Sequence, residues 1–401
     1  MSRPGANDRG EEQEVGPGVE GPVADAELEL SPEEEAEEPR FFEDPKRLAQ
    51  TAIVAILVVI GIYFLLPKIV EDEDVIGKLG KADPVWIGVA LGFAGAMFFA
   101  YVALFRGVVG ESVPLRWKDS YDITMAGLAA TRLFSAGGAG GIVLTYWALR
   151  KAGLRQKETA ARMVAFLVLL YAVYMLTLVI DGILLRTGVL AGQAPAGLTI
   201  VPAAIAGGVI FIFLLVALIP GDLERRFSEA SQEHFWGRTM RRLAAVPSTL
   251  AVGTRQAFAF VREPSRGGLA VLGAVGFWAA DIGILWASFK AFDVEVPLAV
   301  VVQGFFVGMF ANLIPIPGGV GAVDAGMLGA FELFDVHGSI FAAVLTYRLF
   351  AFWLPIPPGV VSFLQLRTTV HRWERERTEP GVGTGIAESL PGTPYTSESK
   401  V

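Results

Sequence analysis

Six apolar stretches, each long enough to cross a bilayer as a helix, constrain the fold of this chain more than any other feature. A helix rises about 1.5 Å per residue, so about 20 apolar residues cross the ~30 Å hydrocarbon core of a membrane. The stretches lie at 48–67, 84–109, 161–186, 198–219, 267–291 and 340–366. They predict an all-α polytopic membrane protein.

Two further apolar regions, 119–150 and 297–334, are broken in the middle by glycine and proline. The breaks read Ser135-Ala-Gly-Gly-Ala-Gly-Gly141 and Ile314-Pro-Ile-Pro-Gly-Gly-Val-Gly321. Neither arm of either region is comfortably long enough to cross the bilayer alone. We therefore interpret both regions as re-entrant helical hairpins, which enter the membrane, turn and leave on the same side.

The distribution of Lys and Arg supports the hairpins and orients the chain. With a cytoplasmic N-terminus and two hairpins, the cytoplasmic segments hold 23 basic residues and the outside loops hold 5. Positive charge is retained on the cytoplasmic side of membrane proteins, and treating either break as a simple crossing removes the bias. The pattern predicts a multi-pass protein with both termini in the cytoplasm.

The two hairpins also reveal an internal repeat. Ala136-Gly-Gly-Ala-Gly140 aligns with Pro317-Gly-Gly-Val-Gly321 at an offset of 181 residues, and the flanking spans follow at similar offsets. Residues 48–186 and 198–366 then each read helix, helix, hairpin, helix, with opposite orientations in the membrane. Inverted repeats whose broken helices meet near the midplane are a transporter architecture.

Three segments lie outside this membrane body. Residues 1–47 carry fifteen acids and five bases, which predicts a disordered acidic cytoplasmic tail. Residues 367–401 are expected to form a second cytoplasmic tail. Residues 221–266 combine eight basic residues with apolar residues near helical spacing, which predicts amphipathic helices on the inner leaflet or, alternatively, a surface for a partner protein.

Ionisable side chains at membrane depth are costly, so they are candidate functional residues. Asp281 and Arg348 lie inside spans, Arg132 precedes the first hairpin tip and Asp324 follows the second. We expect the four to converge where the hairpins meet, either as structural ion pairs or as a substrate or proton-coupling site. Two other charges, Asp181 and Lys290, lie near helix ends, where we expect them to snorkel to the interface.

The hairpin tips are the second group of candidates for substrate binding or gating. Their glycines permit backbone turns that a β-carbon forbids, and their prolines end the helices. The alternative is close helix packing through small residues. The candidates in and beside the tips are Gly137, Gly138, Gly140, Asn312, Pro315, Pro317, Gly318, Gly319 and Gly321.

Several classes of function find no support in the residues. The chain has no cysteine, and its three histidines are far apart, so neither a metal site nor a cofactor is expected. No catalytic set of Ser, His and Asp, no pair of carboxylates with acid–base spacing and no nucleic-acid module is visible. We do not expect an enzyme.

The stretches Leu133-Phe-Ser-Ala-Gly-Gly-Ala-Gly-Gly-Ile142 and Asn312-Leu-Ile-Pro-Ile-Pro-Gly-Gly-Val-Gly321 resemble the signature regions of the lysylphosphatidylglycerol synthase transmembrane, or flippase-like, family. The resemblance covers about residues 48–370. It implies a bacterial plasma-membrane protein related to the lipid-flipping half of enzymes that make and export aminoacylated phosphatidylglycerol. Many relatives carry a glutamate shortly after the second glycine group, where this chain has Asp324. Too few residues follow 366 for an aminoacyl-transferase domain, so the synthase itself is not expected.

These observations lead to one functional hypothesis and two alternatives. The hypothesis is a flippase that moves an anionic or aminoacylated phospholipid through a cavity between the repeats. The first alternative is a transporter of a small soluble anion. The second is a membrane anchor or regulator of a separate lipid-modifying enzyme, which acts through residues 221–266.

The topology can be tested with single cysteines, since the chain has none of its own. Positions in 67–84, 186–198 and 334–339 should react with a membrane-impermeant thiol reagent in intact cells, because these loops should face outside. Cysteines at 156 and 240 should react only after lysis. Labelling of position 156 or 240 in intact cells would refute the topology.

Overall fold

The computed structural model describes residue 77 and residues 79–110, 113, 115–133, 139–193, 195–218, 236–313 and 321–378. All of them belong to one unit, Glu38–Val401. The described part contains helices and no strands. The all-α fold class is therefore confirmed. The predictions for residues 1–47, for the first span at 48–67, for most of both hairpin tips and for residues 379–401 fall outside the described residues.

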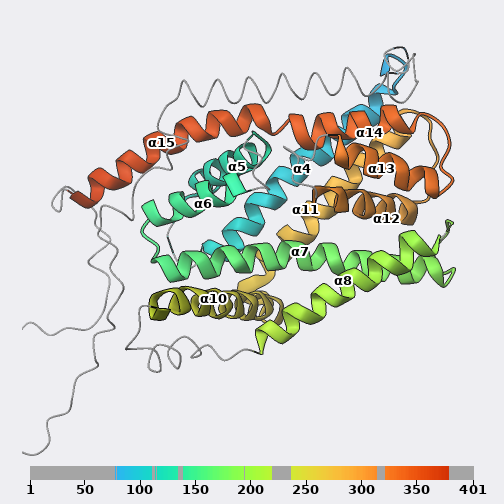
Figure 1. Ribbon diagram of the computed structural model, residues 1–401. Helices are drawn as coiled ribbons and strands as arrows, with labels where there is room; N and C mark the ends of the chain where they lie inside the picture. Colours follow the sequence, from blue (N-terminus) through green and yellow to red (C-terminus); the bar gives the residue numbers. More distant parts are fainter. Residues whose placement is uncertain are drawn as a thin grey trace, which may run out of the picture. The chain divides into compact units, whose positions relative to one another are not determined.

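The described elements follow one another along the chain as shown in Figure 1. They are α4 (Pro84–Val109), α5 (Trp117–Leu133), α6 (Ala139–Lys151), α7 (Gln156–Arg186), α8 (Ala196–Ala217), α10 (Trp236–Arg262), α11 (Pro264–Ala291), α12 (Leu298–Met309), η1 (Phe310–Leu313), α13 (Ala322–Leu333), α14 (Ile340–Arg348), η3 (Leu349–Trp353) and α15 (Ile356–Thr378).

Five stretches of the described chain are long and apolar enough to cross a membrane: α4, α7, α8, α11 and the run Ile340–Trp373. They coincide with five of the six predicted spans. The last is longer than predicted, because α15 continues to Thr378 where we expected a tail from residue 367. A multi-pass membrane protein follows from these five helices.

The arms of the predicted hairpins are short helices. The longest of them, α5, has 17 residues, or about 26 Å at 1.5 Å per residue, which is less than the ~30 Å hydrocarbon core. Arm α5 packs on α6, and α12 packs on α13. The two pairs lie toward opposite ends of the long helices (Figure 1).

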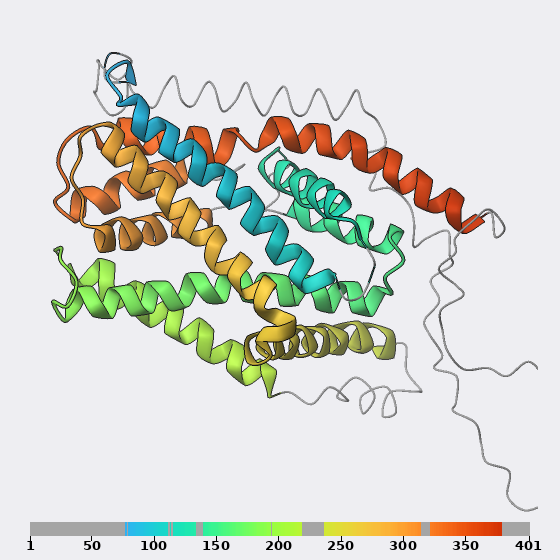
Figure 2. The same cartoon turned by 180° about the vertical axis from the view of Figure 1, so that it is seen from behind.

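The contacts between helices follow a reciprocal pattern. The most extensive contact joins α4 to α11, which run side by side in Figure 2. In addition, α5 packs on α15, and α12 packs on α7. The first arm of each predicted hairpin thus contacts the final helix of the other predicted repeat. The inverted relation of the repeats stays a prediction.

Glycines set the close approach of α4 and α11. A β-carbon on Gly273 would collide with the backbone of Leu104, and one on Gly107 would collide with the backbone of Ala270. In a bilayer, helices associate by packing rather than by the hydrophobic effect, so small residues favour such contacts.

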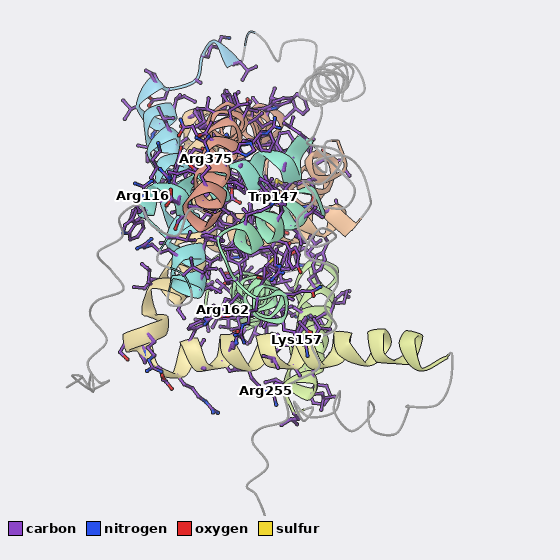
Figure 3. All side chains as sticks on the ribbon, turned by 90° about the vertical axis from the view of Figure 1, so that its left-hand side faces the viewer. Arg116, Trp147, Lys157, Arg162, Arg255 and Arg375 are labelled. Carbon is purple, nitrogen blue, oxygen red and sulfur yellow. The ribbon has the colours of Figure 1, made fainter. Side chains whose placement is uncertain are left out.

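The segment predicted as an amphipathic insert, 221–266, contains α10, and residues 221–235 lie outside the described part. Helix α10 crosses α7 steeply: Figure 3 shows α7 nearly end-on and α10 along its length. Gly253 of α10 lies against Val164 and the carbonyl of Ala161. Helix α10 is therefore packed on the N-terminal half of α7.

Basic residues from distant parts of the chain gather at one end of the helices. Figure 3 looks onto this end and labels Arg116, Lys157, Arg162, Arg255 and Arg375 there. They come from four of the segments that the sequence places in the cytoplasm. Their common position agrees with that topology, and the side of the membrane that this end faces stays a prediction.

Two glycines of α11 provide a matched test of the packing. Gly273→Ala should destabilise the protein by about 1–3 kcal/mol, because the methyl group meets the α4 backbone. Gly268→Ala should be neutral or stabilise by up to about 1 kcal/mol, because nothing lies within 4 Å and alanine favours helix. Thermal unfolding in detergent measures both. Equal effects of the two substitutions would contradict the close contact.

Candidate functional site

The last span is interrupted in the middle of the membrane body. Between α14 and α15 the chain forms the π-helical turn η3, and Leu354 N donates to Leu349 O at 3.0 Å. Pro355 follows, and a proline has no amide hydrogen for the carbonyl four residues earlier, that of Ala351. Single π turns are rare and are frequently found at functional sites.

Arg132, at the end of α5, supplies the missing hydrogen-bond donor. Its Nη2 donates to Ala351 O at 2.7 Å. The guanidinium carbons of Arg132 and Arg348 lie 5.9 and 4.9 Å from the ring centre of Phe352, within cation–π range. The first hairpin therefore completes the hydrogen bonding of the broken span, and both arginines contact one aromatic ring.

Arg348 forms a buried ion pair with Asp324. Arg348 Nε lies 2.8 Å from Asp324 Oδ1, and the two side chains are 6% and 3% exposed. The other carboxylate oxygen of Asp324 accepts from Gly321 N at 2.8 Å, at the start of α13. A carboxylate is favourable there, because the helix N-terminus carries partial positive charge. Gly321 has φ 81°, a conformation that glycine adopts without strain.

Asp281, in α11, is the second buried acid. It is 5% exposed, it interacts electrostatically with both Arg132 and Arg348, and its carboxylate is in hydrogen-bond contact with the Tyr347 hydroxyl. We call Arg132, Asp281, Asp324 and Arg348 the charge cluster. The structure thus brings together the four ionisable residues that the sequence selects.

The remaining candidates are placed less centrally. Gly140 lies in the first turn of α6, and Asn312 is exposed in η1, where its Nδ2 lies 3.2 Å from Met309 Sδ. The candidates Gly137, Gly138, Pro315, Pro317, Gly318 and Gly319 lie outside the described residues. The structure therefore describes the charge cluster but only the last residues of each tip.

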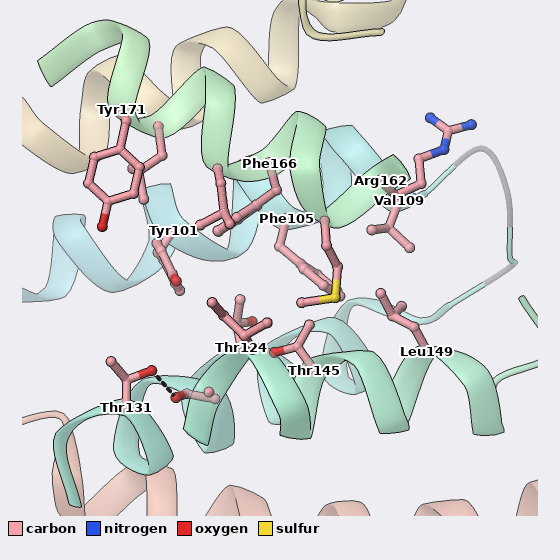
Figure 4. A pocket seen from close by; sticks show the side chains of 16 residues that line it. Tyr101, Phe105, Val109, Thr124, Thr131, Thr145, Leu149, Arg162, Phe166 and Tyr171 are labelled. Carbon is pink, nitrogen blue, oxygen red and sulfur yellow. Dashed lines mark hydrogen bonds between the residues drawn. The ribbon is translucent and has the colours of Figure 1, made fainter. Parts of the chain in front are cut away.

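A cavity of about 170 Å³ lies beside the charge cluster, between α4, the two arms of the first hairpin and α7. Figure 4 shows the side chains of Tyr101, Thr145 and Tyr171 pointing into it. Arg162 stands at one end, with its guanidinium directed away from the cavity and its Nη1 donating to Val108 O at 2.9 Å. Most of the wall is aromatic or aliphatic.

Tyr101 connects the cavity to the charge cluster, because it lines the cavity and interacts electrostatically with Arg132. Two other lining residues, Ile142 and Tyr171, are 44% and 51% exposed, so the cavity also reaches the outer surface of the membrane body. The sequence predicts a cavity between the two repeats, but the residues that line this one all lie in the first, 48–186. Its threonines give little signal, since Thr124 and Thr131 bond to the carbonyls of Ser120 and Gly127 in their own helix.

Within the described residues, no group of three or more His, Cys, Asp or Glu is placed to hold a metal ion.

Comparison with known proteins identifies the family. The model of the lysylphosphatidylglycerol synthase transmembrane region matches residues 50–359. The chain belongs to this family. It is also 25% identical over 338 residues to a protein named UPF0104 membrane protein from Methanothermobacter thermautotrophicus, covering 77% of this chain and 94% of that protein.

The match confirms the resemblance drawn from the two hairpin motifs. The region shared with the lysylphosphatidylglycerol synthase transmembrane family spans both hairpins, all four members of the charge cluster and the whole of η3. It ends at residue 359, in the first turn of α15, so most of that helix lies beyond it. The site described above therefore lies entirely within the family region.

A double-mutant cycle tests the buried ion pair. Arg348→Gln or Asp324→Asn alone should destabilise the protein by about 3–5 kcal/mol, because each leaves a buried charge unpaired. The double mutant should recover much of that loss, as measured by thermal unfolding in detergent. The exposed pair Arg266–Glu263, at 3.5 Å, is the control, and its coupling should stay below about 1 kcal/mol. Additive losses at Arg348 and Asp324 would show that the two do not depend on each other.

Proposed function

We propose that this protein is a lipid transporter that moves an anionic or aminoacylated phospholipid headgroup past the charge cluster, without converting it chemically. The observation that carries the proposal is that two buried polar atoms lack hydrogen-bond partners in the part of the chain that the structure describes. Arg132 Nη1 and Asp281 Oδ1 have no hydrogen-bond partner among the described residues. One is a donor on a cation and the other an acceptor on an acid, and buried polar groups require partners.

A phospholipid headgroup supplies both partners. A phosphate oxygen accepts from a guanidinium N–H in a charge-assisted hydrogen bond. The ammonium group of an aminoacylated headgroup donates to a carboxylate. Arg348 and Asp324 neutralise each other at 2.8 Å, so the proposal assigns the headgroup to Arg132 and Asp281.

The cavity favours a lipid over a soluble anion. Its walls are largely apolar, and Ile142 and Tyr171 line it while also contributing to the exposed surface of the membrane body. A headgroup that enters from that surface keeps its acyl chains in the bilayer. A water-soluble anion has no apolar part to place there.

The architecture supports movement rather than simple anchoring. The first arm of each predicted hairpin packs on the final helix of the other predicted repeat. Such packing is expected where two inverted repeats rock around a central site. The plasma membrane and cytoplasmic termini belong to the same proposal, on the Lys and Arg distribution. A partner protein at residues 221–266 stays an open alternative.

Lipid movement in vesicles tests the proposal. The purified full chain is reconstituted with a fluorescent anionic phospholipid or its aminoacylated form, and the exchange between leaflets is measured. Arg132→Gln should slow both lipids about tenfold or more, since a hydrogen bond to a charged group contributes about 1.5–3 kcal/mol. Asp281→Asn should slow the aminoacylated lipid more than the anionic one.

Arg266→Gln is the matched control, because Arg266 is 69% exposed and lies outside the charge cluster. Gel filtration in detergent establishes that each variant is folded. Wild-type exchange no faster than in protein-free vesicles would overturn the proposal. Uptake of a soluble phosphate ester without lipid exchange would favour the anion transporter instead.

A further inference from the structure

Asp181, in α7, is not where the sequence suggests. It lies five residues before the end of the helix at Arg186, where an acid was expected to snorkel to the interface. Instead Asp181 is only 7% exposed, and its Oδ2 is buried without a hydrogen-bond partner among the described residues. The snorkelling prediction is wrong for Asp181, because α8 and α12 pack over this face of α7 (Figure 1).

A second unpartnered acceptor lies in the same junction. Gln303 of α12 is 0% exposed, and its Nε2 donates to Leu198 O of α8 at 2.7 Å. Its Oε1 has no partner in the described part of the chain. A β-carbon on Gly182, the residue after Asp181, would lie 3.3 Å from Gln303 Nε2. The amide of Gln303 therefore reaches the α7 backbone beside Asp181.

Two flanking contacts fix the register of α7 against α12. On the N-terminal side of Asp181 along α7, the Tyr174 hydroxyl donates to Phe306 O at 2.8 Å. On the C-terminal side of Asp181, a β-carbon on Gly192 would meet both Leu185 of α7 and Val300 of α12. Asp181 lies between Tyr174 and Leu185 on α7, and Gln303 lies between Val300 and Phe306 on α12. Seven residues make about two helical turns, so Asp181 shares the stripe of Tyr174 that faces α12.

Within the described part of the chain, the elements that pack on this end of α7 place no cation in the junction to balance a carboxylate. Helices α8 and α12 and the segment 188–195 have no titratable or charged residue. On α7 the nearest such groups are Tyr174, which is bonded to Phe306, and Arg186, which is exposed at the helix end. An unpaired carboxylate in apolar surroundings is far less stable than the neutral acid. Two buried acceptors in one junction that lack a donor among the described residues can share one added hydrogen.

We propose that Asp181 and Gln303 form a proton-binding site, in which the protonated carboxyl of Asp181 donates its hydrogen to Gln303 Oε1. The use of this proton rests on the proposed transport function. Helix α12 packs on α13, and the first turn of α13 carries Asp324. Release of the proton leaves a charge that the closed junction cannot hold. Proton release is therefore coupled to opening of α12, and so to the hairpin that supplies Asp324 to the charge cluster.

Protonation is measured on the purified full chain without any transport assay. The infrared spectrum at neutral pH should contain the carbonyl band of a protonated carboxyl that disappears in Asp181→Asn. The control is Asp335→Asn, since the Asp335 side chain is 61% exposed and its φ of 60° suits asparagine. This control should keep the band. A spectrum unchanged by Asp181→Asn would show an ionised Asp181 and overturn the proposal.

Thermal unfolding against pH gives a second reading. The neutral acid stabilises the folded protein and the stranded charge destabilises it, so the wild type should lose melting temperature as pH rises. Asp181→Asn should lack that part of the loss, because its amide donates to Gln303 at every pH. Introduced into the wild type, Gln303→Met should lower the melting temperature at neutral pH. Introduced into Asp181→Asn, it should lower the melting temperature less. The same pH dependence in Asp181→Asn and wild type would contradict the site.

Coupling is tested in vesicles with an imposed proton gradient. The gradient should accelerate lipid movement by the wild type, and Asp181→Asn should lose that acceleration. An unchanged wild-type rate would overturn the coupling. If the wild type moves no lipid at all, the proposed function fails, whereas the infrared band still decides whether Asp181 and Gln303 bind a proton.

Discussion

A backbone carbonyl inside a bilayer has no water to bond, and this constraint organises the centre of the protein. Pro355 leaves the Ala351 carbonyl without its helical donor, and Arg132 provides one at 2.7 Å from a position 219 residues earlier. The break in the last span and the position of the first hairpin are therefore interdependent. Moving the hairpin would expose an unsatisfied carbonyl and a buried guanidinium together, so the two move only as part of a larger rearrangement.

The same constraint extends to the charges. Arg348 lies beside the break and is balanced by Asp324 at 2.8 Å, while Asp281 interacts with both arginines and with Tyr347. Removing a buried charge is costly chiefly because its partner is left uncompensated. The charge cluster consequently connects α5, α13, α11 and the last span. Within the described residues, the unpartnered donor on Arg132 and the unpartnered acceptor on Asp281 make the cluster a candidate for ligand recognition as well as for structure.

Asp281 and Arg348 could be selected from the sequence because each stands alone in a long apolar run, where a charge is costly wherever the helix packs. Asp181 was misjudged because its place near a helix end predicted that it would snorkel to the interface. Its distance from the helix end was right, but the burial of that end depends on α8 and α12. The cavity was predicted between the repeats, yet α4, α5, α6 and α7 bound it within the first one, because its position depends on contacts among four separate helices.

The sequence by itself determined the all-α membrane class, the five described spans, the short helices between them and the family, since span length and hydropathy are local properties of the chain. Only the tertiary structure decided which charges meet, that Arg132 completes the turn at η3, and that the Asp181 carboxyl is enclosed with Gln303. These features are contacts between helices far apart in the chain. Their free energy depends on packing geometry and on the absence of water, and neither is encoded in any one segment.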